Sequence, residues 1–296
     1  DYFRKHHPAL EVVKTYSILF KGLALKGKPF QFNKIRSLDF VQAIHPTQNY
    51  STLTSEKHQS LQTYLDETKH PEKAVLPNAL NDTTYTGKGV KVAVVDTGID
   101  YKHPDLAKNY QGGFDTVDLD EDPMETKADE GVPTLHGSHV AGTIAASGDL
   151  KGVAPDAELY GYRALGPGGS GTSVQVIAAL EEAVKDGVDI INLSLGNDVN
   201  GPDYPTSRAV NKAIEKGVAV VIANGNAGPD QWTVGAPATS TMALAVGAAT
   251  NPEKVFELED TLEHNTFLLN NIPGLPDWSD EQGAYVTKFT QNARMK

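Results

Sequence analysis

Cysteine is absent from this chain of 296 residues, so the chain can hold no disulfide framework, no thiolate zinc site and no cysteine nucleophile. It also lacks an apolar run long enough to cross a bilayer, and we expect no membrane partner. Basic residues are in the minority, because 26 Lys and Arg stand against 38 Asp and Glu. No nucleic-acid partner is expected, since binding to phosphates needs a basic surface.

The first part of the chain predicts a small module. Within residues 1–53, a partly alternating pattern at 11–18 and a second at 39–45 predict strands, and 32–38 predicts a short helix. The following residues, 54–79, are polar and rich in Ser, Thr, Gln, Lys and His. They are typical of a linker.

From residue 87 onward the pattern alternates between strands and helices. Residues 90–95 form a continuous apolar run, typical of a strand buried on both faces. Helices are predicted where Thr172 caps a start and Gly187 follows an end. The expected helices cover 172–186 and 206–216, and the further strands 188–195, 218–223 and 242–248. Residues 80–250 therefore predict an α/β fold with a doubly wound parallel sheet, preceded by the small α/β module, whereas 251–296 stay unassigned.

Two motifs carry the chemistry. Asp96 ends the apolar run in Asp96-Thr97-Gly98, and His136 opens a helix in His136-Gly137-Ser138-His139. A carboxylate after a strand can orient a histidine that takes the proton of a serine hydroxyl. Because a helix start disfavours a protonated ring, we expect His136 to stay neutral. His139 is interpreted as a packing and hydrogen-bonding residue, since helical zinc pairs usually have i, i+4 spacing.

Asn226 lies in a glycine-flanked turn after the predicted strand at 218–223. Its side-chain amide can donate a hydrogen bond to a developing oxyanion. The alternative is a turn asparagine that tolerates left-handed backbone.

Two short segments beyond strand ends are candidates for substrate binding. Small residues there allow a polypeptide to pair alongside as an extra strand, although ordinary loop chemistry is the alternative. The candidate residues are Gly169, Ser170 and Gly171 in one segment, and Ser194, Leu195 and Gly196 in the other.

Taken in this order, the motifs resemble those of the subtilisin-like (S8 family) serine proteases. Within that family, the amino-acid sequences of four segments resemble those of the minor extracellular protease (Vpr) group. The segments are 112–115, 122–126, 162–171 and 224–229. The resemblance implies that Asp96 and His136 are two of three charge-relay residues, that Asn226 is the oxyanion donor, and that the two small-residue segments hold polypeptide substrates. It also implies an extracellular protein whose residues 1–53 are the remnant of an inhibitory propeptide, acting as an intramolecular inhibitor.

The nucleophile motif of that family, Gly-Thr-Ser-Met-Ala, does not occur in the 296 residues. Ser240, in Thr239-Ser240-Thr241-Met242-Ala243, resembles it but lacks the preceding glycine and precedes a predicted strand instead of a helix. We therefore expect a fragment that is inactive alone, with the serine beyond Lys296 and with 251–296 as the start of an inserted domain or as foreign sequence. A non-catalytic binding protein or pseudoenzyme is the alternative. An aspartic protease is disfavoured, because its two carboxylates would need a second Asp-Thr-Gly.

No metal or other cofactor is expected, apart from weak calcium binding. The acidic run from Asp118 to Asp122 resembles the start of an EF-hand loop, but Pro123 takes the position of the required glycine. The run is therefore interpreted as a solvated surface loop. Asp105 matches a calcium ligand of the family, although its partners are missing, so the metal site is not carried over.

Overall fold

The computed structural model describes residues 2–52, 85–228 and 230–248. Its contacts divide the chain after Gly247, and the first unit contains nearly all the described residues. The predicted linker at 54–79 and the unassigned residues 251–296 lie outside the described residues. The domain boundaries there stay predictions.

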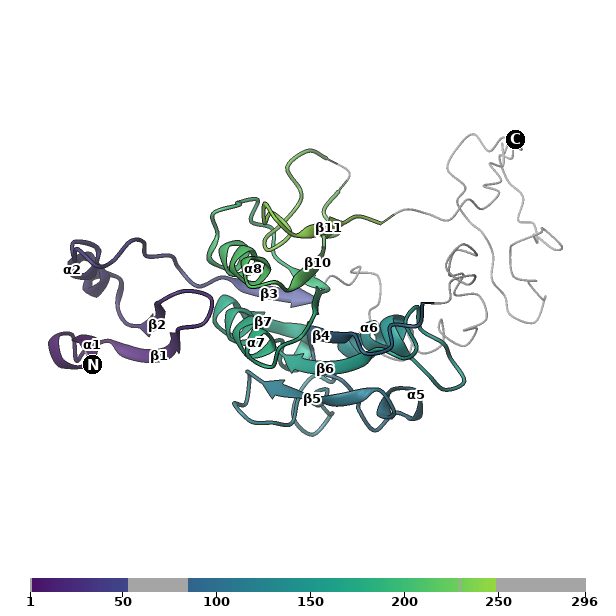
Figure 1. Cartoon of the computed structure of the whole chain (residues 1–296). Coiled ribbons are helices and arrows are strands. Elements are labelled where there is room, and N and C mark those ends of the chain that lie inside the picture. Colours follow the sequence, from purple (N-terminus) through teal and green to yellow (C-terminus); the bar gives the residue numbers. More distant parts are fainter. Residues whose placement is uncertain (1, 53–84, 229, 249–296) are drawn as a thin grey trace, which may run out of the picture. The chain divides into compact units, whose positions relative to one another are not determined.

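A six-stranded parallel sheet forms the centre of the first unit (Figure 1). The chain enters the sheet at β4, forms β5 at one edge, places β6 between β4 and β5, and then adds the remaining strands on the other side. This arrangement is the predicted doubly wound sheet. In spatial order the strands are β11 (Leu244–Val246), β10 (Ala219–Ala223), β8 (Ile190–Leu193), β4 (Lys91–Asp96), β6 (Glu158–Arg163) and β5 (Tyr110–Asp115).

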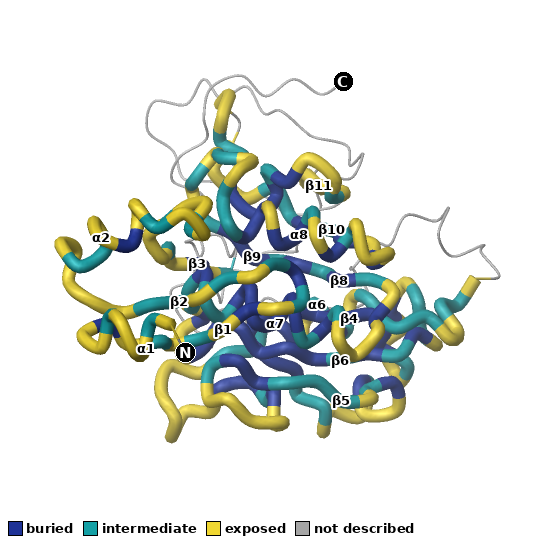
Figure 2. Tube along the Cα trace, turned by 60° about the vertical axis from the view of Figure 1, so that its left-hand side comes forward, coloured by how far each residue is buried: buried dark blue, intermediate teal, exposed yellow. Residues whose placement is uncertain are grey.

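Helices cover both faces of the sheet, as alternate residues of β4 demonstrate. Ala93 and Val95 belong to the apolar cluster that includes residues of α7 (Ser173–Lys185) and α8 (Pro205–Glu215). Val92 and Val94 belong to the cluster of α6 (His136–Ala145) and the short α5 (Pro104–Ala107). Since successive side chains of a strand point to opposite faces, α7 and α8 lie on one face and α6 on the other. The central strands are accordingly buried (Figure 2).

The predicted helices are confirmed, together with the reasons for their ends. The Thr172 hydroxyl caps α7 by accepting the N–H of Val174, and the Thr172 N–H donates to the Gln175 side-chain oxygen at 3.0 Å. Gly187, with φ of 69°, follows the end of α7 in the left-handed conformation that glycine adopts without strain. α8 begins with Pro205, which suits the first helical position.

The single strand predicted at 188–195 is wrong in one respect, because the chain changes sheets within it. β8 ends at Leu193, and after Ser194 the chain continues as β9 (Leu195–Gly196) in a second, three-stranded sheet. The order of that antiparallel sheet is β7-β3-β9, with β7 covering Ser170–Thr172 and β3 covering Asn49–Thr52. The 3-10 turn η3 (Pro167–Gly169) leads into β7.

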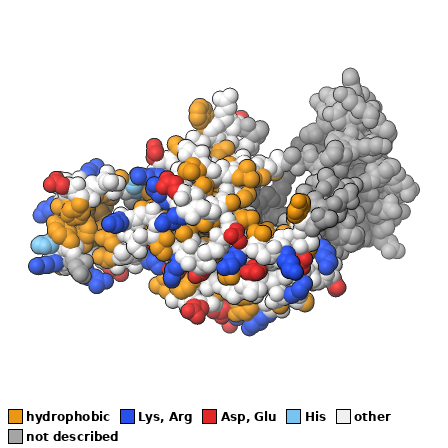
Figure 3. Space-filling model, viewed as in Figure 1, with side chains coloured by type: hydrophobic (Ala, Val, Ile, Leu, Met, Phe, Trp, Pro, Cys, Tyr) orange, Lys and Arg blue, Asp and Glu red, His pale blue; other side chains and the backbone are white. Residues whose placement is uncertain are grey.

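The N-terminal module, residues 2–48, holds a two-stranded antiparallel hairpin of β1 (Glu11–Tyr16) and β2 (Gly22–Lys26). Three short helices accompany it: α1 (Tyr2–His6), η1 (Pro29–Gln31) and α2 (Phe32–Arg36). The strand predicted at 39–45 is wrong, since that stretch is irregular and neither of its faces is buried. Phe40, for example, is 59% exposed. Figure 3 shows hydrophobic side chains gathered on the surface of this module.

Within the described residues, no helix has both the length and the apolar character needed to cross a membrane.

Candidate active site

Asp96 and His136 meet at the carboxyl end of β4. Asp96 is the last residue of that strand and His136 is the first residue of α6. The Oδ1 atom of the fully buried Asp96 lies 2.7 Å from Nδ1 of His136 and also accepts the Thr97 N–H at 2.7 Å. With a carboxylate as its partner, Nδ1 carries the proton, and Nε2 is left as the basic nitrogen.

The helix start does not decide the direction of the His136 pKa shift, contrary to expectation. Burial lowers the pKa of His136, but the hydrogen bond to Asp96, the charge of Asp96 and the charge of Glu125 outweigh it, so that the pKa is raised. A full negative charge at 2.7 Å acts more strongly than the partial charge of a helix end. The neighbouring His139 shows the opposite change: burial first, and the charge of His136 second, lower its pKa.

Glu125 belongs to the same site, and sequence reasoning did not assign it a role. Its buried carboxylate accepts the N–H and hydroxyl of Ser138 at 2.8 and 2.9 Å and the hydroxyl of Thr134 at 2.6 Å. Burial raises the pKa of Glu125 against these hydrogen bonds, which lower it. The residue thereby fixes the first turn of α6 to the preceding loop. No hydrophobic periodicity surrounds Glu125 in the sequence. The residue could have been found only because it lies in segment 122–126, whose sequence resembles the Vpr group.

Gly137 explains how the helix start comes so close to the strand end. Its N–H donates to the hydroxyl of Thr97 at 2.8 Å. A Cβ atom at this position would lie only 2.0 Å from the carbonyl oxygen of Gly98. A glycine directly after His136 therefore permits the contact that brings the ring to Asp96.

The two candidate substrate-binding segments lie on either side of one strand. β3 pairs with β7 on one side, with Tyr50 opposite Gly171 and Ser51 opposite Ser170. On its other side Ser51 also faces Gly196, and Thr52 faces Leu195. The structure thus brings the two segments together through residues 49–52 of the same chain.

Gly169 and Ser194 frame this three-stranded sheet. Gly169 precedes β7, and a Cβ atom there would lie 3.0 Å from the Thr52 hydroxyl oxygen. Ser194 lies between β8 and β9, where its hydroxyl accepts a hydrogen bond from the Asn192 side chain at 3.0 Å. The groove that holds β3 is therefore closely fitted along its backbone.

Asn226 lies exposed in the turn that follows β10, after Gly225 with φ of 103°. Because β4, β8 and β10 are parallel, the end of β10 faces the same edge of the sheet as Asp96.

Ser240 occupies a turn before β11, so the predicted strand after it is present. Its hydroxyl donates to the Asn211 side chain at 2.6 Å and accepts the N–H groups of Met242 and Ala243 at 3.3 and 3.2 Å. The oxygen therefore serves to hold this turn.

The candidate calcium ligands are engaged with protein groups. Asp105 accepts the N–H groups of Asp149 and Leu150 at 3.1 and 3.4 Å. Asp118 pairs with Arg163 at 2.6 Å, and Asp122 accepts the Tyr101 hydroxyl at 2.7 Å, so the acidic loop is not merely solvated. Throughout the described ranges, no three His, Asp or Glu side chains are grouped to hold a metal. Weak calcium binding stays a prediction.

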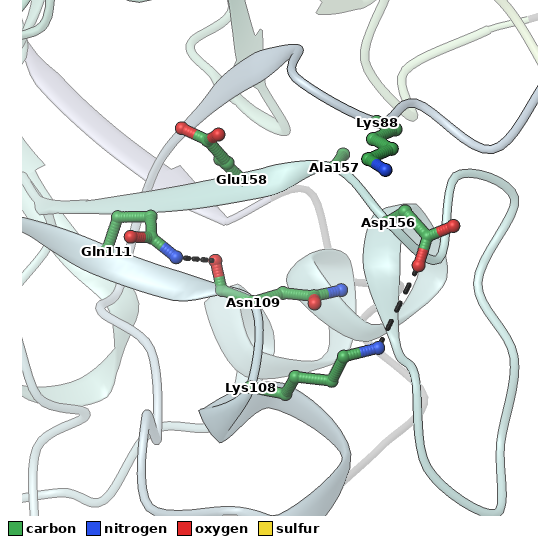
Figure 4. Close-up of a pocket in the computed structure, with 7 residues that line it drawn as sticks. All are labelled: Lys88, Lys108, Asn109, Gln111, Asp156, Ala157 and Glu158. Carbon is green, nitrogen blue, oxygen red and sulfur yellow. Dashed lines mark hydrogen bonds and ion pairs between the residues drawn. The ribbon is translucent and has the colours of Figure 1, made fainter.

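A pocket at the amino ends of β4, β5 and β6 is separate from this site (Figure 4). Lys108 and Asp156 form an ion pair of 3.8 Å there, and the side-chain amide of Asn109 donates hydrogen bonds to the carbonyl oxygens of Ala145 and Pro155. Since Asp96 ends β4 at the other edge of the sheet, the pocket has no part in the Asp–His pair. Its lining residues are Lys88, Lys108, Asn109, Gln111, Asp156, Ala157 and Glu158.

Comparison with known families decides the relationship: the subtilase (peptidase S8) family model matches residues 87–293. The chain belongs to the subtilase family. Minor extracellular protease Vpr of Bacillus subtilis (strain 168) is 46% identical over 251 residues, which cover 82% of this subtilase chain and 31% of Vpr. The predicted relationship to Vpr is confirmed.

Subtilisin E of Bacillus subtilis (strain 168) is 41% identical over 175 residues, which cover 57% of this chain and 43% of that protein. A solved cold-adapted subtilisin-like serine proteinase aligns at a TM-score of 0.49 with 32% identity, covering 57% of this chain and 58% of its own. The chain spans less than half the length of Vpr and of subtilisin E.

Proposed function

We propose that this subtilase chain supplies the Asp–His pair and the substrate groove of an extracellular serine endopeptidase acting on polypeptides, and that its residues 1–53 act as an intramolecular inhibitor. The observation that carries the proposal is the position of β3, which is paired on both sides by the two small-residue segments. Pairing of an extended polypeptide on both sides would let a protease hold a peptide bond next to its catalytic groups. The extracellular location follows the name of Vpr.

In this proposal Asp96 holds the Nδ1 proton of His136, and Nε2 acts as the base. Nε2 takes the serine hydroxyl proton as the serine oxygen bonds to the carbonyl carbon, and returns it to the leaving amine as the C–N bond breaks. The raised pKa of His136 favours the imidazolium formed between these steps. The Asn226 amide donates to the oxyanion.

The inhibitory role rests on a second contact, between the N-terminal module and α7. The buried carboxylate of Glu181 accepts the N–H groups of Ile18, Leu19 and Ser17 at 2.8, 2.9 and 3.0 Å. The Tyr16 hydroxyl donates to the Val174 carbonyl at 3.0 Å. With the module docked on the helix, β3 is held at high effective concentration in the groove, and a substrate must displace it.

The absent nucleophile motif leads us to propose that these 296 residues alone do not hydrolyse peptides. The same absence favours the second candidate, a binding protein on a subtilase scaffold. A serine-directed fluorophosphonate should leave the purified chain unlabelled, and Ser240→Ala should change nothing. Labelling that disappears with Ser240→Ala would overturn the inactivity. A Gly-Thr-Ser-Met-Ala motif in the coding sequence past Lys296 would decide for the enzyme.

Inhibition tests the groove directly. A peptide of residues 1–53 should inhibit Vpr or subtilisin E weakly, with a dissociation constant of up to about 1 mM. The control peptide carries Ser51→Pro, because proline cannot pair within a strand that has neighbours on both sides. Equal inhibition by both peptides, or none by either, would contradict the proposed position of β3.

A further inference from the structure

Tyr50 is the deeply buried side chain of β3. The burial of this strand alternates: Asn49 and Ser51 are exposed, whereas Tyr50 is 1% exposed. Successive side chains of a strand point to opposite sides, so Tyr50 is directed into the protein. It belongs to the same apolar cluster as Leu195 of β9. The path of β3 therefore carries one side chain into a closed pocket.

The inner end of this pocket is polar. The Tyr50 hydroxyl lies 2.6 Å from Oγ1 of Thr206, which is fully buried in the first turn of α8. Two further polar atoms close to this hydroxyl, Nδ2 of Asn197 and the hydroxyl of Tyr204, are buried without a hydrogen-bond partner among the described residues. Burial raises the pKa of Tyr50 to about 12, although the hydrogen bond with Thr206 and the neighbouring Asn197 side chain each lower it, while Tyr204 raises it further. A phenol is neutral in such a place and is both donor and acceptor.

A phenylalanine would fill the apolar part of the pocket and leave its polar end unpaired. A buried polar group that loses its hydrogen-bond partner destabilises the protein by more than the hydrogen bond had contributed. The reason is that the group has been removed from water and its desolvation is no longer compensated. Sites that hydrogen-bond a substrate hydroxyl therefore discriminate strongly against the analogue that lacks it.

We propose that this pocket selects tyrosine over phenylalanine at the substrate position that Tyr50 occupies, and that Thr206 is the residue that determines this specificity. The inference rests on the proposed function, since it assumes that substrates follow the path of β3. The ligand class is an extended polypeptide with tyrosine at the residue opposite Gly171. A purely structural contact would instead stabilise the chain's own strand without any selectivity between peptides.

A binding experiment on the full chain separates these alternatives. Tyr50→Ala combined with Ser51→Pro empties the pocket and releases β3 from its backbone pairing, because proline cannot pair within a strand that has neighbours on both sides. Near-ultraviolet circular dichroism checks that the variant is folded. Fluorescent peptides of residues 47–53, with tyrosine or phenylalanine at position 50, are then titrated by polarisation. The tyrosine peptide should bind roughly tenfold to a hundredfold more tightly. Adding Thr206→Val should remove the preference, and Thr206→Ser, which keeps the hydroxyl, should retain it.

Equal affinity of the two peptides, or a preference that survives Thr206→Val, would overturn the selectivity and leave the groove intact. Binding of neither peptide to the folded variant would overturn the proposed function and this inference with it.

A second measurement uses the intact chain, in case Tyr50→Ala with Ser51→Pro does not fold. Tyr50→Phe and Thr206→Val should each speed hydrogen exchange of the 49–52 amides by about tenfold or more, and the double variant should add little. Additive effects would show that Thr206 does not serve the tyrosine hydroxyl.

Discussion

The N-terminal module and the six-stranded sheet differ in where their stability comes from. In β4 every residue from Val92 to Asp96 is buried, and helices cover both faces of the sheet. In the module a hairpin of two strands leaves Val13 51% exposed. A two-stranded hairpin is marginal in water unless it packs against something else. The module therefore depends on its neighbour, whereas the sheet supplies its own core.

The docking contacts support this difference. Tyr16 and Leu19, two of the few buried residues of the module, belong to the apolar cluster of the sheet and α7. Glu181 then satisfies the N–H groups of residues 17–19. Part of the buried surface of the module is thus shared with the sheet and α7.

The largest expected effect is in the sheet. Val94→Ala removes two methyl groups from a fully buried site and should lower the free energy of unfolding by about 2–3 kcal/mol. The matched change in the module, Val13→Ala, should stay within about 0.5 kcal/mol, because that side chain is half exposed. Urea denaturation measures both, and equal losses would break the comparison.

The next effect is on docking. Glu181→Gln removes the charge that accepts three N–H groups and should weaken protection of the 11–26 amides by about 1.5–3 kcal/mol in hydrogen exchange. Protection of β4 should not change. The adjacent Glu182→Gln is the control, because its ion pair with Lys185 lies at the surface, where solvent screens it, and its carboxylate has no hydrogen bond with the described residues of the module. A loss spread equally over β4 would mean that the module and the sheet unfold together.

The prediction with the smallest effect concerns the proton on His136. A histidine pKa raised on folding adds stability below its unfolded value of about 6.5, and that stability is lost as pH rises through the higher folded pKa. Asp96→Asn removes the negative charge and the charged hydrogen-bond acceptor that raise the pKa, so that burial is opposed mainly by the weaker charge of Glu125. The pKa of His136 should therefore fall and the pH window of added stability should narrow. Glu125→Gln should lower the pKa less, since its charge is the smallest of the causes. Histidine NMR titration measures all three proteins, and an unchanged pKa in Asp96→Asn would contradict the assignment.

Short sequence patterns were sufficient to predict those helices and strands whose formation depends on neighbouring residues. The apolar run predicted β4, and the Thr172 cap with Gly187 predicted α7. Strand β5 had no such signal, because Gly112 and Gly113 suggest a turn. In the structure Gly113 lets β5 approach β6, since a Cβ atom there would lie 1.7 Å from the Gly161 oxygen.

Long-range causes escaped prediction. The partners of Glu181 lie 162 to 164 residues away and are backbone amides, which leave no mark on the sequence. The same limit applies to Glu125, whose partners become visible only when the loop folds onto α6. Asp96 and His136 could be paired in advance because their motifs stand at a strand end and a helix start, and the parallel sheet brings such ends together.

The direct passage from β8 through Ser194 into β9 has a consequence for the cost of binding. One run of chain is first a core strand of the central sheet and then, after a single residue, an edge of the groove. That edge has little conformational freedom of its own to lose when a polypeptide pairs with it. Almost all of the conformational entropy lost on binding is therefore lost by the incoming polypeptide. We expect the length and stiffness of that polypeptide to affect the binding affinity more than any rearrangement of the groove.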